Sequence, residues 1–174
     1  MDEEQQELEE TKKKPAWGKT VKVSLGVLGG LSLLMGYISA AGMQESEREI
    51  GARRPIDDFF ASFNMRNLEV LRNTLHYPHI QISANGTRIY YDPEEFSVDF
   101  QSLLEEGWVL TSLDSCALRQ SCEDKVHFEV QFSMHKMHGE GVRRYATYQS
   151  LWIVTLREGR WGIQCRSSFP AQNA

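Results

Sequence analysis

The clearest groups for proton transfer lie on one predicted strand, between Lys125 and His135. This strand alternates between apolar and polar side chains, so the two sets face opposite sides of a sheet. The apolar set is Val126, Phe128, Val130, Phe132 and Met134, and the polar set is His127, Glu129, Gln131, Ser133 and His135. Because a neutral histidine paired with a buried glutamate can act as general acid and base, His127 and Glu129 are the candidate catalytic residues.

A pocket around these two residues requires the polar face to point into the domain. The last predicted strand also has a polar side, formed by Gln164, Arg166 and Ser168. If both polar sides point inward, the expected pocket lining is His76, Tyr77, His79, Tyr148 and Arg166. The alternative is a polar face that is solvated or covered by a second subunit, with Glu129 in an ordinary ion pair.

Charge and cysteine content limit the other kinds of site. The chain has 174 residues and a net charge of −5 at pH 7, which argues against a nucleic-acid partner because phosphate binding needs a clustered excess of lysine and arginine. Cys116, Cys122 and Cys165 lack the spacing of a metal site, and we assign no metal and no cofactor. We interpret them as buried thiols, with a Cys116–Cys122 bridge as the alternative in an oxidising compartment.

Three helices are expected to precede or interrupt the strands. The first is predicted to start near Pro55, and its apolar residues recur at helical spacing: Ile56, Phe59, Phe60 and Phe63. Asn67 is the expected N-cap of the second, which ends before His76. The third is predicted to start at the Asp92-Pro93 capping pattern and to end at Gly107. Its inward side chains are Phe96, Phe100, Leu103 and Leu104.

The remaining elements are predicted strands. Asn85-Gly86 indicates a tight hairpin between the segments 79–84 and 87–91. Four longer strands then follow one another, separated by polar or glycine-containing turns: 108–118, 125–136, 142–156 and 160–169. Strands in one run with helices set apart from them predict an α+β fold with an antiparallel sheet.

The order of these elements, and the closing hairpin with its Gly-Arg-Trp-Gly-Ile motif at 159–163, resemble the nuclear-transport-factor-2-like superfamily, including SnoaL-like cyclases and ketosteroid isomerases. The resemblance covers about residues 55–170 and implies a cone-shaped curved antiparallel sheet with three covering helices. That superfamily hosts enzymes, binding modules and scaffolds alike, so function has to be argued from the site. Its ketosteroid isomerases use an inward carboxylate base. Asp114 is the only aspartate inside a predicted strand, so that base carries over to no position of this chain. Glu129 is then the only substitute.

The N-terminal third has a different character. Residues 1–22 read as a charged tail, and the 22 residues from Val23 to Gln44 carry no charge, enough for a helix of about 33 Å that spans a bilayer. Gly26, Gly30 and Gly36 form a small-residue stripe suited to helix packing. Lysines before the span favour a cytoplasmic N-terminus, and residues 45–54 are expected as a linker. The alternatives are a cleaved signal peptide that releases a secreted or periplasmic domain, or a glycine-rich soluble or targeting segment.

Together these features favour a single-pass membrane protein that displays a non-catalytic or ligand-binding domain. Its expected partners are the membrane, other membrane-protein subunits or a second copy of the chain, and a small hydrophobic ligand. The alternative is a small isomerase, dehydratase or cyclase that uses His127 and Glu129 on a hydrophobic substrate.

Overall fold

A six-stranded curved sheet and three helices make up the part of the chain that the computed structural model describes, residues 46–171. The elements are a first helix (46–64), α2 (Leu68–Asn73), β1 (Leu75–Ser83), β2 (Gly86–Tyr90), α3 (Phe100–Glu105), β3 (Trp108–Cys122), β4 (Lys125–His138), β5 (Gly141–Arg157) and β6 (Arg160–Pro170). This mixed α+β arrangement with an unclosed sheet fits a cone fold.

The predicted tail and membrane span, with Gly26, Gly30 and Gly36, lie outside the described residues. Within residues 46–171, no helix has both the length and the apolar character needed to cross a bilayer.

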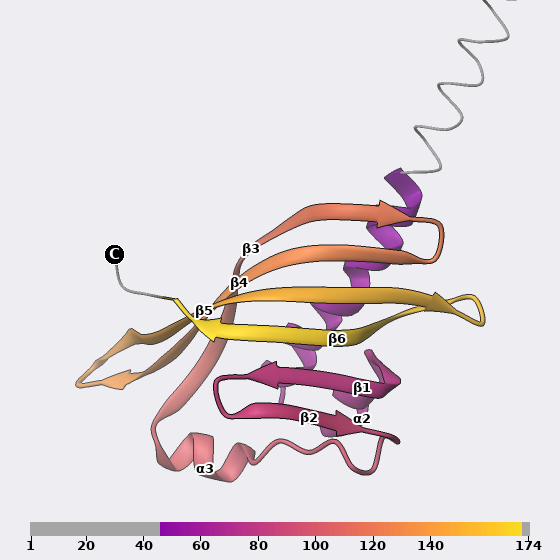
Figure 1. Ribbon diagram of the computed structural model, residues 1–174. Helices are drawn as coiled ribbons and strands as arrows, with labels where there is room; N and C mark the ends of the chain where they lie inside the picture. Colours follow the sequence, from indigo (N-terminus) through magenta and orange to yellow (C-terminus); the bar gives the residue numbers. More distant parts are fainter. Residues whose placement is uncertain (1–45, 172–174) are drawn as a thin grey trace, which may run out of the picture. The chain divides into compact units, whose positions relative to one another are not determined.

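The strands are arranged in the order β2-β1-β6-β5-β4-β3 (Figure 1). The predicted hairpin and the four long strands are confirmed, and β1 with β2, β3 with β4, β4 with β5 and β5 with β6 pair antiparallel. The expectation of a wholly antiparallel sheet is wrong at one place, because β6 pairs parallel to β1, with Leu75 opposite Ile163 and Ile80 opposite Cys165. This pairing joins the early hairpin to the late strands, a long-range contact that local sequence patterns do not encode.

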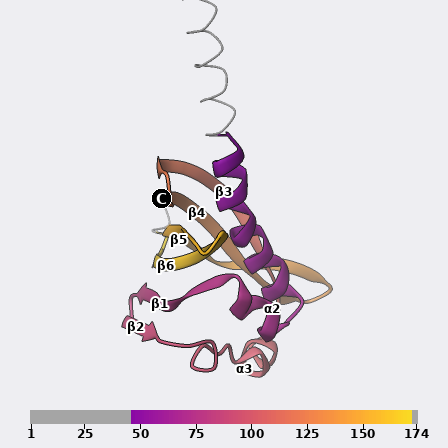
Figure 2. The same cartoon turned by 90° about the vertical axis from the view of Figure 1, so that its right-hand side faces the viewer.

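The first helix is longer than predicted and covers one face of the sheet (Figures 1 and 2). It is already helical at residue 46, so residues 46–54 belong to it and are not a linker. The reason is that Ala52, fully buried, extends the apolar stripe of Ile56, Phe59 and Phe60 one turn upstream. We call the sheet face against this helix the inner face and the opposite one the outer face.

The third helix is shorter than predicted. The capping contacts form, with the Glu95 N–H donating to Asp92 Oδ1 at 3.1 Å, but α3 begins only at Phe100, with Asp99 as its N-cap. Phe96 instead enters the core, 5.1 Å from the Tyr90 ring, and its carbonyl accepts a 2.9 Å bond from Arg72 Nε. Tertiary packing of Phe96 therefore overrides the local helix signal.

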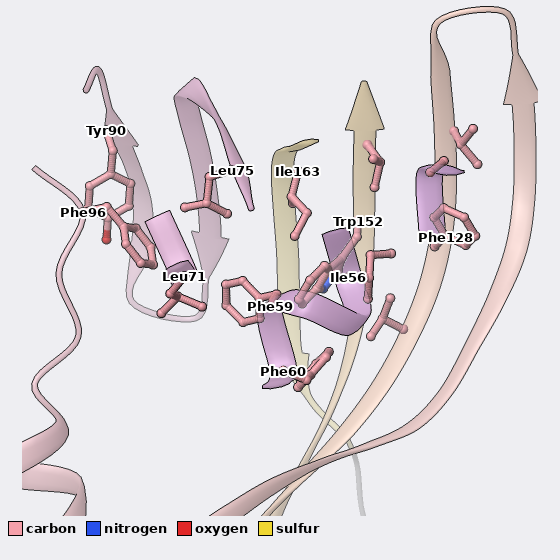
Figure 3. Close-up of a cluster of buried hydrophobic side chains, with 14 residues drawn as sticks. Ile56, Phe59, Phe60, Leu71, Leu75, Tyr90, Phe96, Phe128, Trp152 and Ile163 are labelled. Atoms are coloured by element: carbon pink, nitrogen blue, oxygen red, sulfur yellow. The ribbon is translucent and has the colours of Figure 1, made fainter. Parts of the chain in front are cut away.

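The core is built around Trp152, at the centre of the sheet (Figure 3). Its ring stacks on Phe60 at 5.5 Å and meets Phe59 edge-on at 5.1 Å. Its indole N–H donates to Ser150 Oγ at 2.7 Å, so the one polar atom of the side chain is satisfied. Helix and sheet are thus joined through aromatic contacts on the inner face.

All three cysteines are free thiols, but Cys122 is exposed and the other two are only partly buried. Cys116 and Cys122 both lie on β3. Two residues six positions apart on one extended strand are about 20 Å apart, far beyond the Cα separation that a disulfide allows. The alternative of a Cys116–Cys122 bridge is therefore wrong for this fold.

Gly162 is expected to be intolerant of any side chain. A Cβ there would lie 2.6 Å from Cδ2 of His76, whose ring covers it. We expect Gly162→Ala to lower the free energy of unfolding by about 1–3 kcal/mol, as forced overpacking does, measured by denaturant unfolding. Gly141→Ala is the matched control, since a Cβ there meets only ordinary van der Waals distances. Equal stability of the two variants would contradict the close contact, and His76→Ala should restore part of the loss in Gly162→Ala.

Candidate functional site

The polar face of β4 is the outer face of the sheet. Val126 and Phe128 are buried against the helix, whereas His127 is partly exposed and Glu129 is exposed. Arg119 Nε donates to Glu129 Oε2 at 2.7 Å, an exposed ion pair across neighbouring strands. The polar face of β4 therefore does not point into the domain. It is a solvated face with Glu129 in an ion pair, and the candidate residues His127 and Glu129 lie away from the interior.

Arg166 points to the inner face because β6 contains a bulge. The register of β5 and β6 shifts between Ile153–Cys165 and Val154–Ile163, so Gln164 has no partner on β5. One extra residue changes which side chains share a face. Ile163, fully buried in the core, and Arg166, which pairs with Trp152, therefore both face inward, although strict alternation predicts opposite faces.

The Arg166 guanidinium lies among aromatic rings. Its Cζ is 4.6 Å from the centre of the Phe59 ring, 5.5 Å from Trp152 and 5.8 Å from Phe96. Burial lowers the pKa of Arg166 to about 10, so the group remains charged at neutral pH. Contacts with ring faces offset part of the cost of removing this charge from water.

Two neutral side chains accept hydrogen bonds from Arg166. Its Nε donates to His79 Nε2 at 3.1 Å, and its Nη2 donates to Gln81 Oε1 at 3.3 Å. His79 is fully buried, and its Nδ1 lies 3.1 Å from the Ile163 carbonyl. This geometry requires the neutral imidazole with its proton on Nδ1. Burial, and next the charge of Arg166, lower the pKa of His79 to about 3.

A small cavity of about 80 Å³ adjoins Arg166 on the inner face. Its other lining residues are Phe59, Phe60, Phe63, Thr111, Phe132, Met134 and Trp152. Phe59, Phe60 and Trp152 are buried, whereas Phe63, Phe132 and Met134 are partly exposed. The cavity thus has an aromatic floor and a rim that solvent reaches.

No aspartate or glutamate in the described range 46–171 is buried, and none of them lines this cavity. Asp114, the one aspartate within a strand, accepts hydrogen bonds from Ser112 at 2.7 Å and from Ser133 at 2.5 Å. Since Thr111 and Met134 line the cavity, their neighbours Ser112 and Ser133 belong to the opposite face. An inward carboxylate base is therefore absent from this part of the chain.

The other predicted lining residues are divided between the two faces. Tyr148 is on the inner face, stacked on Phe132 at 5.0 Å. Tyr77 packs on the core and its hydroxyl donates to the Arg72 carbonyl at 3.3 Å. His76 instead contacts the outer face, with Nδ1 2.9 Å from Thr155 Oγ1, and burial, then Arg160 and Arg157, lower its pKa to about 4. The structure brings His79 and Arg166 together, but not His76.

Sequence patterns missed two groups. One is the acceptor Gln81 together with the rings of Phe59, Phe96 and Trp152 around Arg166, whereas His79 was among the predicted lining residues. The other is a cluster in which Ser112 lies 2.9 Å from His135 Nε2 and 2.7 Å from Asp114. A hydroxyl has one proton, and Ser112 donates it to the carboxylate, so His135 acts as donor and does not activate Ser112 as a nucleophile. The described residues contain no group of three or more potential metal ligands.

Comparisons of sequence give no match, either with models of known protein families or with curated proteins. Comparison with solved structures does give matches. A nuclear-transport-factor-2-like protein with a cystatin-like fold from Novosphingobium aromaticivorans has a TM-score of 0.66 and 11% identity, covering 78% of this chain and 89% of that one.

Two further structures have more specific descriptions. A ketosteroid isomerase-like protein from Erwinia carotovora atroseptica matches with a TM-score of 0.56 and 12% identity, over 71% of this chain and 96% of that one. A putative Ca/calmodulin-dependent kinase II association domain from Exiguobacterium sibiricum matches with a TM-score of 0.52 and 14% identity, over 72% and 95%. Identities this low establish the fold alone, because one fold hosts many functions.

Proposed function

We propose that this chain, whose described domain has the nuclear-transport-factor-2-like fold, is a membrane-anchored, non-catalytic binding domain that serves as an accessory or assembly subunit of a membrane protein complex. The observation that carries the proposal is the inner cavity, which is lined by aromatic rings and one arginine without a carboxylate from residues 46–171. Such a lining can hold a ligand, but it lacks the carboxylate base that isomerases of this fold use.

The isomerase, dehydratase or cyclase alternative is disfavoured by the same geometry. His127 and Glu129 belong to the outer face, and Glu129 is engaged by Arg119. His79, which contacts the lining residue Arg166, is neutral because burial keeps its pKa at about 3. A base of such low pKa is poorly matched to proton abstraction near pH 7.

The membrane part of the proposal rests on sequence. The uncharged stretch from Val23 to Gln44 is long enough to span the hydrocarbon core, and the lysines before it favour a cytoplasmic N-terminus. The folded domain then lies on the other side of the bilayer, within reach of other membrane subunits.

The outer face supports a role in assembly. Ile89, Ile80, Cys165 and Ile153 are register neighbours across four strands, and Leu151 and Phe169 on the same face are exposed. Ile89 is exposed as well, whereas Ile80, Cys165 and Ile153 are half-buried. A contiguous apolar patch of this kind is typical of protein interaction surfaces. A membrane subunit or a second copy of the chain is the proposed occupant.

Alkaline carbonate extraction tests the anchor. We expect the full-length chain to stay with the membrane pellet, and Leu33→Arg to shift it to the supernatant, because a charge at the centre of a span costs about 2.5–3.5 kcal/mol on insertion scales. Leu151→Arg, in the folded domain, is the matched control and should stay in the pellet.

Release of the unmodified chain by carbonate would refute the anchor, and a mature N-terminus near Gly42 would establish cleavage instead. Assembly is read from the same membranes after gentle detergent extraction. There the unmodified chain should migrate above its monomer mass of 20.0 kDa, and Leu151→Arg should reduce that mass.

A further inference from the structure

We infer that the cavity beside Arg166 binds a small apolar carboxylate, with the acid group on the free edge of the guanidinium and the hydrocarbon part among the aromatic rings. This inference rests on the binding role proposed above and names the chemical class of its ligand.

The first argument is the unbalanced charge of Arg166. The guanidinium has five N–H donors, and its contacts within residues 46–171 are one bond from Nε and one from Nη2, both to neutral acceptors. None of the salt bridges among these residues involves it. Arg166 is partly buried, and a cation partly withdrawn from water without an opposite charge carries a desolvation cost, so an anion is favoured there.

The second argument is geometric. Nε and Nη2 are directed toward His79 and Gln81, which leaves Nη1 as the unengaged corner of the fork. The guanidinium carbon lies over the rings of Phe59 and Trp152, 4.6 and 5.5 Å from their centres, and these two residues also line the cavity with Arg166. A planar carboxylate matches the edge of a guanidinium better than a spherical ion does.

The third argument is the chemistry and size of the cavity. Apart from Arg166, Thr111 is its one polar lining residue, and the Thr111 hydroxyl already accepts a bond from Trp108 Nε1 at 3.0 Å. An aromatic wall favours a hydrocarbon group, since binding sites are mostly apolar with a few placed polar groups. A volume of about 80 Å³ restricts that group to a single ring or a short chain.

A purely structural role for Arg166 is the competing explanation. In that case Arg166 only stabilises the fold, through its bonds to His79 and Gln81 and its contacts with the rings. The cavity then has no preference for acids. The two explanations differ in one measurable property, which is selectivity between an acid and its neutral amide of the same shape.

Calorimetric titration of the purified full chain tests the inference. The probes are benzoate and hexanoate, with benzamide and hexanamide as their neutral counterparts. The chain is held in lipid nanodiscs, or in plain buffer if it does not associate with membranes, so failure of the anchor leaves this test intact. We expect saturable binding of the acids and at least tenfold weaker binding of the amides.

Variants locate the site. Arg166→Met should lose the preference for acids, Arg166→Lys should keep part of it, and Arg119→Met on the outer face should bind as the unmodified chain does. If Arg166→Met fails to fold, Met134→Trp at the cavity rim leaves the guanidinium in place and should abolish binding of acids and amides together. Equal binding of acids and amides, or no saturable binding of any probe at millimolar concentration, would overturn the inference.

Discussion

Replacing Trp152 by alanine is expected to remove a large part of the stability of the domain. The side chain is 1% exposed and packs on Phe59 and Phe60 of the first helix. Truncation of a buried aromatic residue costs about 3–5 kcal/mol, and most domains have only about 5–15 kcal/mol of stability in total. Near-ultraviolet circular dichroism and thermal unfolding of the purified chain measure the effect.

Leu151→Ala is the matched control for this prediction. Leu151 is the chain neighbour of Trp152, but it lies on the outer face and is 43% exposed, so its truncation should change the free energy of unfolding by less than about 1 kcal/mol. If the two alanine variants were equally stable, the assignment of inner and outer faces to β5 would be wrong.

The strands were the most predictable part of the fold, and the reason is visible on β4. Its apolar and polar residues alternate without interruption from Val126 to Met134, and a two-residue period specifies a strand that is buried on one side. The Asn67 cap was equally clear, because its side chain makes the expected bond to the Val70 N–H at 3.1 Å. Features that depend on neighbouring residues in the sequence were therefore recovered.

Contacts between distant segments were not recoverable in this way. The parallel pairing of β1 with β6 joins residues such as Ile80 and Cys165, and the place of Phe96 depends on Tyr90 and Arg72. The Asp92-Pro93 capping pattern forms only a single turn. The packing of Phe96 then outweighs the local preference for helix, and α3 begins at Phe100. Long-range packing decides such cases, and a single sequence carries no direct record of it.

At the candidate site, one property of Arg166 was predictable from the sequence and another was not. Arg166 was predicted to line a pocket, and the structure has it on the inner face with His79. Strict alternation would have put polar residues from β4 beside it, but the bulge at Gln164 moves Arg166 to the apolar side of the sheet instead. The bulge therefore places the Arg166 side chain beside the aromatic cavity, on the opposite face of the sheet from His127 and Glu129.

Acidification is expected to destabilise the domain at pH values well above those at which carboxylates titrate. The folded pKa values of His76 and His79 are about 4 and about 3, below the 6.5 of an unfolded histidine. The unfolded chain therefore binds protons first as pH falls, so stability is full above about pH 6.5 and declines toward pH 4. Each proton taken up only by the unfolded state lowers stability by about 1.4 kcal/mol per pH unit.

Denaturant unfolding at several pH values between 6.5 and 5.0 measures this slope before most carboxylates protonate. We expect the unmodified chain to lose roughly 2–4 kcal/mol over that interval if two histidines contribute. His79→Gln and His76→Gln should each reduce the slope, because each removes one group that only the unfolded state protonates. Gln120→Ala is the control, since Gln120 is exposed on β3 and its removal takes away no titratable group, so the slope should be unchanged.

A flat stability profile between pH 6.5 and 5.0 would contradict the buried, neutral state of both histidines. A slope that disappears only in His76→Gln would instead assign the effect to the outer face, where His76 contacts Thr155. Loss of the slope in His79→Gln would support the neutral imidazole that accepts the bond from Arg166 Nε.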